Sequence, residues 1–244
     1  MVAKIRREEF KYYLGLSLEE PLLRSLRSFM RLDPACENER GSYTVKSLYF
    51  DTPNSKDLTE KLDGIIEREK FRLRTYLSST TDPVFKLERK CKVDNVIEKT
   101  SLRLSKAHAI ALQSGDFECL NDLSDPFGDF CYQKFTSQGY RPRVVVEYDR
   151  RAFTLPFCNT RITLDSGLRS ASGWIDIVSD RAPMVDIFLD RMSVLEVKFE
   201  KYLPVHIQEL LSLYSLKRCA ISKYVLCNAH LANGPWSDEL VRPF

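Results

Sequence analysis

Charged or polar residues occupy every second position in several segments of the chain, with apolar residues between them. Successive side chains of a β-strand point to opposite faces, so each segment predicts a strand with one apolar face and one charged face. The alternating positions are Arg7, Glu9 and Lys11; Lys70, Arg72 and Arg74; Lys86, Glu88, Lys90 and Lys92; Arg141, Arg143, Glu147 and Asp149; Arg161, Thr163 and Asp165; and Glu196, Lys198 and Glu200. Strands of this kind in one sheet would form a broad surface of mixed charge.

The same patterns divide the chain into an α+β arrangement. Strands are predicted at 4–14, 42–50, 68–76, 84–92, 96–104, 141–154, 160–165, 173–178 and 193–199. Helices are predicted at 18–32, 105–113 and 204–216, with a helical or irregular piece at 117–138 and a short segment around Ser222, Lys223 and Tyr224. Neither an internal repeat nor a long linker interrupts the 244 residues, which predicts a single domain over 1–244.

The charged face could simply be in contact with solvent, as in many antiparallel sheets. For a single strand that interpretation is the better one. Arg72 and Arg74, however, lie two apart on one face, which is unfavourable without an anionic partner. The predicted helices also have apolar faces that need the outer face of the sheet for packing. We therefore expect a closed antiparallel β-barrel of eight or nine strands, with helices outside and a wet, basic lumen.

Composition narrows the possible functions. The formal net charge is +3, with 29% charged and 43% hydrophobic residues, so the total charge does not indicate a nucleic-acid binder. We expect no membrane segment, because no stretch approaches the roughly 20 apolar residues of a membrane span. The charged N-terminal sequence predicts no signal peptide. Seven scattered cysteines without zinc-site spacing predict reduced thiols and a cytoplasmic protein.

A basic lumen would suit a small polyanion, because arginine forks match phosphate oxygens and lysine supplies point charge. The expected lining cations are Arg7, Lys11, Lys70, Arg72, Arg74, Lys86, Lys90, Arg143, Arg161 and Lys198. Carboxylates on the same segments could hold Mn²⁺ or Mg²⁺, which favours phosphoryl transfer. The chain has neither GxxxxGK[ST] nor GxGxxG, so ATP would not be bound through those loops.

Taken together, eight short motifs resemble a known family, and they cover nearly the whole chain. They are Arg7-x-Glu9-x-Lys11-Tyr12, Ser47-Leu-Tyr-Phe-Asp51-Thr52, Arg72-x-Arg74, Glu88-x-Lys90, Arg141-Pro-x-x-x-x-x-Tyr148-x-Arg150-x-Ala-Phe153, Arg161-Ile-Thr-x-Asp165, Leu195-Glu196-x-Lys198 and Ser222-Lys223-Tyr224. In this order they resemble the catalytic domain of the vacuolar transporter chaperone (VTC) polyphosphate polymerases, within the triphosphate tunnel metalloenzyme (CYTH-like) superfamily.

The resemblance implies an eight-stranded tunnel in which the terminal phosphate of ATP, or of another nucleoside triphosphate, is moved onto inorganic polyphosphate with a divalent metal. It implies that the triphosphate or the chain is held by Lys11, Arg72, Arg74, Lys90, Arg143 and Lys223. It implies that Glu196 holds the metal, and Glu9, Glu147 and Asp165 are secondary metal or orienting candidates. By strand parity alone, Lys86 and Arg161 are candidates for the lumen.

One departure separates the branches of the superfamily. The triphosphatase and adenylate cyclase branch carries Glu-x-Glu-x-Lys on its first strand, whereas the first position here is Arg7. This favours a polymerase over a triphosphatase that hydrolyses tripolyphosphate or nucleotides. A polyphosphate-binding module without catalysis stays open as a third interpretation. We expect no nucleic-acid partner, and the sequence does not identify a protein partner.

Overall fold

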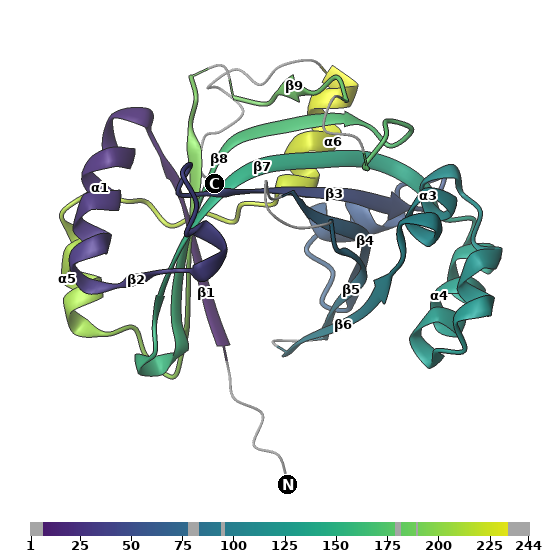
Figure 1. The fold of residues 1–244 in the computed structure, drawn as a ribbon, viewed down its shortest axis with the longest axis horizontal. Coiled ribbons are helices and arrows are strands. Elements are labelled where there is room, and N and C mark those ends of the chain that lie inside the picture. The colour runs from purple at the N-terminus through teal and green to yellow at the C-terminus, as the bar shows by residue number, and fades with distance from the viewer. Residues whose placement is uncertain (1–6, 78–82, 94–95, 179–181, 189, 234–244) are drawn as a thin grey trace, which may run out of the picture.

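The computed structural model describes residues 7–77, 83–93, 96–178, 182–188 and 190–233. Within them the strands form one antiparallel sheet, whose main path has the order β1-β10-β8-β7-β3-β4-β5-β6 (Figure 1). The short strands β2 and β9 pair with β7 and β8. The strands are β1 (Arg7–Leu14), β2 (Arg31–Leu32), β3 (Tyr43–Asp51), β4 (Arg68–Leu77), β5 (Phe85–Val93), β6 (Val96–Leu104), β7 (Arg141–Leu155), β8 (Thr160–Ser172), β9 (Val185–Asp186) and β10 (Ser193–Glu200).

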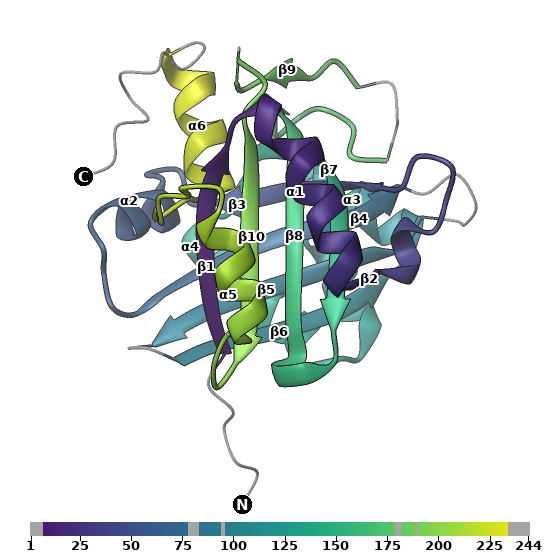
Figure 2. The ribbon, with the colours of Figure 1, turned by 90° about the vertical axis from the view of Figure 1, so that its left-hand side faces the viewer.

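The sheet is strongly curled, with the helices around it (Figures 1 and 2). Helices α1 and α5 lie against strands β1, β10 and β8, whereas α3 and α4 lie at the opposite end of the molecule. The helices are α1 (Leu16–Phe29), α2 (Lys56–Leu62), α3 (Lys106–Ser114), α4 (Pro126–Gln138), α5 (Val205–Ser212) and α6 (Lys223–Asn233). None of the helices in the described ranges is both long and apolar enough to cross a membrane.

Complete closure of the barrel is not confirmed. The two ends of the main path are β1 and β6, and the described residues show no pairing between them. A side-chain contact reaches β1 from β5, the strand next to β6, since Lys90 Nζ lies 3.7 Å from Glu9 Oε2. The fold is therefore a half-barrel. Among the described residues, its open side is spanned by an ion pair between side chains and not by backbone hydrogen bonds between strands.

Apolar residues cover the outer face of the sheet, as the alternation predicts. Leu22, Leu23 and Leu26 of α1 are fully buried against the outer residues of β8 and β10. Phe135 of α4 packs on Phe71 at the other end, with ring centroids 5.1 Å apart. Burial of each such side chain contributes roughly 1.5–3 kcal/mol. This packing turns the charged positions of the same strands toward the concave face.

Most predicted elements are confirmed to within a few residues, with two differences. The strand predicted at 173–178 is wrong, because β8 continues from Thr160 to Ser172 and ends there. The segment around Lys223 is instead the start of an eleven-residue helix, α6. This helix lies against β7 and β8 and places Lys223 at one end of the concave face.

Candidate functional site

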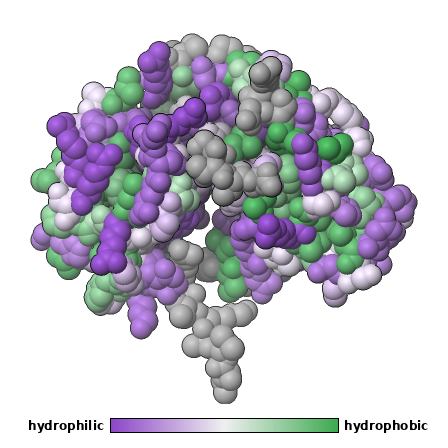
Figure 3. All heavy atoms as spheres, viewed as in Figure 1, coloured by the Kyte–Doolittle hydropathy of each residue, from purple (hydrophilic) through white to green (hydrophobic). Residues whose placement is uncertain are grey.

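A cavity of about 260 Å³ opens on the concave face of the sheet, and Figure 3 shows the molecule hollowed between its two halves. Twelve cationic side chains and only three carboxylates, Glu9, Glu88 and Glu196, line it. The cations are Lys11, Lys61, Arg68, Lys70, Arg72, Arg74, Lys90, Lys92, Lys99, Arg150, Lys198 and Lys223. Such an excess of positive charge in a concave site strongly favours an anionic ligand.

Glu196 is the centre of the first charge cluster in this cavity. It lies on β10 opposite Lys11 of β1 in the strand register, and Lys11 Nζ is 3.4 Å from Glu196 Oε1. Lys198 Nζ is 3.0 Å from the other oxygen, Oε2, and Lys223 Nζ is 2.9 Å from Oε1. Burial alone would raise the pKa of Glu196, but these ammonium groups hold it well below its ordinary value. Glu196 is therefore ionised.

A buried ion pair fixes the back of this cluster. Arg150 donates two hydrogen bonds to Asp165, at 2.6 and 2.7 Å, in a bidentate arrangement. Lys223 Nζ lies 2.6 Å from the same carboxylate. Asp165 is fully buried and does not line the cavity, so it acts on Arg150 and Lys223 rather than on a ligand.

Glu88 is the centre of a second cluster on β5. Arg72 lies within 2.7 Å of its carboxylate, Arg74 at 3.8 Å and Lys99 of β6 at 2.5 Å. Burial would raise the pKa of Glu88, but the two guanidinium groups lower it to about 2. One carboxylate thus holds three cations in place, and their combined charge exceeds its own.

Tyrosine rings form the floor between the clusters. The hydroxyl of Tyr49 accepts a hydrogen bond from Arg72 at 3.1 Å, and its ring stacks on Tyr224 of α6 at 4.8 Å. The ammonium of Lys70 lies 4.8 Å from the centre of the Tyr224 ring. Tyr148 holds Lys223 in the same way, at 4.9 Å. Each ring offers its negative face to a cation and limits its movement.

Two carboxylates of the cavity are the candidate ligands for a divalent metal. The described residues contain no group of three metal-ligating side chains. Glu9 and Glu196 nevertheless lie on neighbouring strands and share Lys11 and Lys198, which are within 3.5 Å of both carboxylates. Burial would raise the pKa of Glu9, yet Lys11 and Lys198 lower it to about 2. Mg²⁺ and Mn²⁺ are often held by one or two such carboxylates, with substrate oxygens and water as the other ligands.

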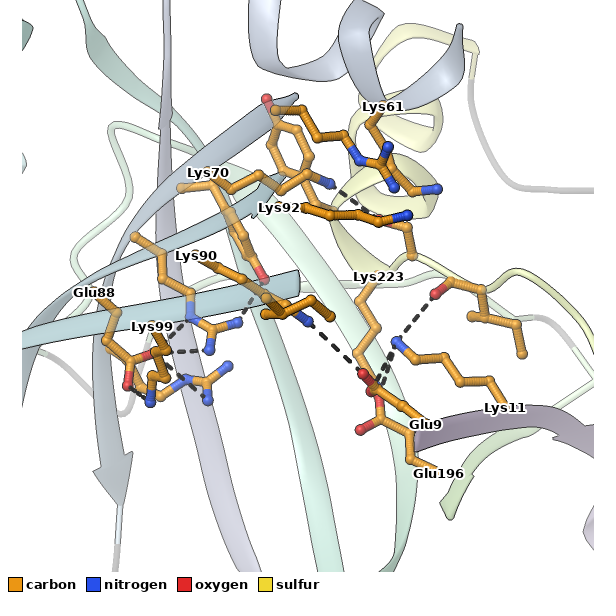
Figure 4. Close-up of a pocket in the computed structure, with 18 of the residues that line it drawn as sticks. Glu9, Lys11, Lys61, Lys70, Glu88, Lys90, Lys92, Lys99, Glu196 and Lys223 are labelled. Carbon is orange, nitrogen blue, oxygen red and sulfur yellow. Dashed lines mark hydrogen bonds and ion pairs between the residues drawn. The ribbon is translucent and has the colours of Figure 1, made fainter. Parts of the chain in front are cut away.

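Of the predicted ligands of the triphosphate, the structure brings Lys11, Arg72, Arg74, Lys90 and Lys223 together in the cavity, as Figure 4 shows for the three lysines. It places Lys70 and Lys198 there as well. Lys86 and Arg161 line a larger hollow of about 940 Å³, which shares Arg72, Lys90 and Lys198 with the cavity. In that hollow Arg161 donates to Asp33 at 2.9 Å.

Arg143 and Glu147 do not reach the cavity. Tyr148 and Arg150 of β7 line the cavity, so Glu147 faces the opposite side of the sheet, whereas Arg143 lies beside a bulge and donates to Asn228 of α6 at 3.4 Å. Glu147 pairs there with Lys46, at 3.6 Å, and with Arg169. The side chain of Arg7 lies outside the described part of the structure, although its backbone pairs with Glu200.

Sequence reasoning missed several lining residues. Arg150 belongs to the quoted Tyr148-x-Arg150 motif, so its parity with Tyr148 could have identified it. Lys99 follows from the register of β6 against β5, where it pairs with Lys90. Arg68, the first residue of β4, continues the alternation of Lys70, Arg72 and Arg74 toward the N-terminus, so the pattern could have identified it. Lys61 comes from helix α2, where no strand pattern indicates it.

Comparisons with known proteins agree with this geometry. A family model described as VTC domain matches residues 6–232 of the chain. A search of curated protein sequences found no match.

The fold is similar to that of a candidate adenylate cyclase from Bacillus halodurans, at 16% identity and a TM-score of 0.51, over 89% of this chain and 96% of the other. It is also similar to a candidate adenylyl cyclase from Hippeastrum with a dominant triphosphatase activity, at 13% identity and a TM-score of 0.53, over 95% and 98% of the two chains. At these identities the likeness shows a common fold.

Proposed function

The chain belongs to the VTC domain family, and we propose that it is a metal-dependent phosphotransferase that moves the terminal phosphate of ATP onto inorganic polyphosphate. The observation that carries this proposal is the cavity itself, where twelve cations surround three carboxylates on the concave face. Family membership supports a substrate of the triphosphate or polyphosphate class.

The clusters around Glu88 and Glu196 would bind different parts of the substrate. Arg72, Arg74 and Lys99 around Glu88 would bind the non-reacting phosphates, because arginine forks match their oxygens. Lys11 and Lys223 around Glu196 would hold the reacting phosphoryl group and neutralise the charge that spreads over its oxygens. Arg150 would stay hydrogen-bonded to Asp165 and add positive charge to the cavity beside Lys11 and Lys223.

Glu196 and Glu9 are the residues that would hold a divalent cation, Mn²⁺ or Mg²⁺. When bound, the metal would supply charge neutralisation at the phosphate oxygens. Lys11 and Lys198 already lie beside both carboxylates and keep them ionised, so the donors are ready without a change in protonation.

A product assay tests the proposal. Purified protein with ATP and Mn²⁺ should yield a ladder of polyphosphate on a gel, and Glu196→Gln should abolish it, because the amide keeps the shape but removes the charge. Glu147→Gln is the matched control, since Glu147 is about as buried but lies on the outer face. We expect this variant to retain the ladder. Equal activity in wild type and Glu196→Gln would contradict the proposed role of Glu196.

Triphosphate hydrolysis is the second candidate function. The Hippeastrum protein with a dominant triphosphatase activity shares this fold, which favours it. A free-phosphate assay run beside the gel separates the two, since hydrolysis releases orthophosphate without a ladder. If neither polyphosphate nor orthophosphate is formed, and ATP or polyphosphate still raises the melting temperature of the protein, the chain is a binding module.

A further inference from the structure

A third hollow, of about 400 Å³, lies where the start of β7, the end of β8 and helix α6 meet. We call it the outer hollow; its lining residues are Arg141, Pro142, Arg143, Ser172, Trp174, Asn228 and Leu231. It shares no residue with the cavity, and its lining has two guanidinium groups and no carboxylate. We propose that the outer hollow is a second anion site, which binds a phosphate-type anion, either orthophosphate or a polyphosphate chain.

The two arginines carry the argument, because within the described residues they have no carboxylate partner, unlike Arg89 and Arg169 of the outer face. On the outer face, Arg89 pairs with Glu69 at 2.7 Å and Arg169 with Glu147 at 3.0 Å. Within the described part of the chain, neither Arg141 nor Arg143 has a carboxylate partner in its hollow. Like charges two positions apart on one strand repel each other, and a bound anion would relieve this.

The remaining lining residues add donors. Ser172 and Trp174 line the hollow, and their side chains carry a hydroxyl and an indole N–H that can donate to an anion. Trp174 is 67% exposed. Gly173 between them fixes the shape: a Cβ at this position would lie 2.5 Å from the backbone nitrogen of Arg143. Its own N–H donates to the carbonyl of Arg143 at 3.0 Å. The end of β8 is therefore held directly against the arginine-bearing part of β7.

Helix α6 connects the outer hollow to the cavity. Arg143 Nε donates to Asn228 Oδ1 at 3.4 Å, and Asn228 Nδ2 donates to the carbonyl of Tyr224 at 2.9 Å. Tyr224 lines the cavity next to Lys223. An anion in the outer hollow would thus contact the same helix that supplies two residues to the cavity.

Fluorescence of Trp174 tests the site. The chain has two tryptophans, so Trp236→Phe leaves Trp174 as the single indole. Titration with inorganic triphosphate at fixed ionic strength should give a saturable change, and Arg141→Ser with Arg143→Ser should weaken it by about tenfold, as loss of charged hydrogen bonds does. Arg72→Ala, which alters the cavity and the larger hollow but not the outer hollow, should leave this change intact, so the result does not depend on the proposed reaction.

Two results would overturn the proposal. A fluorescence change that is unaffected by the double arginine substitution would place the anion elsewhere. A change that disappears in Arg72→Ala would mean that Trp174 reports on the cavity. Orthophosphate in the same titration identifies the source: saturation by orthophosphate supports a single-phosphate site, whereas saturation by triphosphate and longer chains alone supports a polyphosphate site.

Discussion

Lys70 shows how crowding of like charges changes a single residue. Burial lowers its pKa, and the neighbouring Lys61, Arg68 and Lys90 lower it further, to about 7. The carboxylate of Asp57 acts in the opposite direction and raises the pKa of Lys70, but it does not offset the other effects. Lys70 is therefore largely neutral at weakly alkaline pH while no anion is bound. A bound polyanion would reverse this balance and favour the ammonium form.

We predict that triphosphate binding takes up a proton at Lys70. Affinity should fall as the pH rises from about 6 to about 8.5, because protonation of the lysine then has to be driven by binding. Calorimetry at the higher pH, in buffers of different ionisation enthalpy, measures the uptake directly. Lys70→Met should remove most of it, whereas Lys86→Met, in the larger hollow, should not. Identical proton uptake in wild type and Lys70→Met would contradict this account.

Helix α6 closes one end of the cavity, and Tyr224 fastens it to the sheet. The hydroxyl of Tyr224 donates to Asp51, a fully buried carboxylate at the end of β3. Asp51 also accepts the backbone N–H groups of Asp57 and Leu58 at 3.0 and 3.1 Å, so one side chain joins β3, α2 and α6. The position of Lys223, one residue earlier, depends on this attachment.

We predict that Tyr224→Phe destabilises the protein by about 1–3 kcal/mol, the cost of leaving a buried acceptor short of a donor. Triphosphate affinity should fall with it, since Lys223 is then less well fixed against Asp165 and Glu196. Thermal unfolding and calorimetry measure the two effects. Tyr132→Phe is the control, because that hydroxyl donates to the exposed Glu118. If both variants behaved alike, the attachment of α6 through Asp51 would be refuted.

At the scale of the whole molecule, the half-barrel separates two kinds of surface that alternate along every strand. Helices cover the apolar outer face. On the concave face, twelve cations and three carboxylates line one cavity, an excess of positive charge that favours an anionic ligand. A net charge of only +3 hides this arrangement. The proposed function therefore rests on the distribution of charge rather than on its total.

Alternation predicted most of the strands and the charged inner face of most of them. It failed on β7, where both faces carry charged residues: Tyr148 and Arg150 line the cavity, whereas Glu147 faces outward and Arg143 lies beside a bulge. Helix α6 has a weak apolar pattern of its own, and tertiary contacts such as Tyr224 with Asp51 hold it in place. Closure of the barrel depended on β1 and β6 meeting, which no local signal specifies.

The most direct test of the central claim is the affinity of inorganic triphosphate for wild type, Arg72→Ala and Arg74→Ala, measured by calorimetry. Each variant should lose about 2–5 kcal/mol of binding free energy, or roughly thirtyfold and more in Kd, because each removes a charged contact inside the cavity. Arg89→Ala is the matched control: Arg89 lies on the same pair of strands but faces outward and pairs with Glu69. It should bind like wild type. Unchanged affinity in both Arg72→Ala and Arg74→Ala would contradict the claim that the concave face is the anion site.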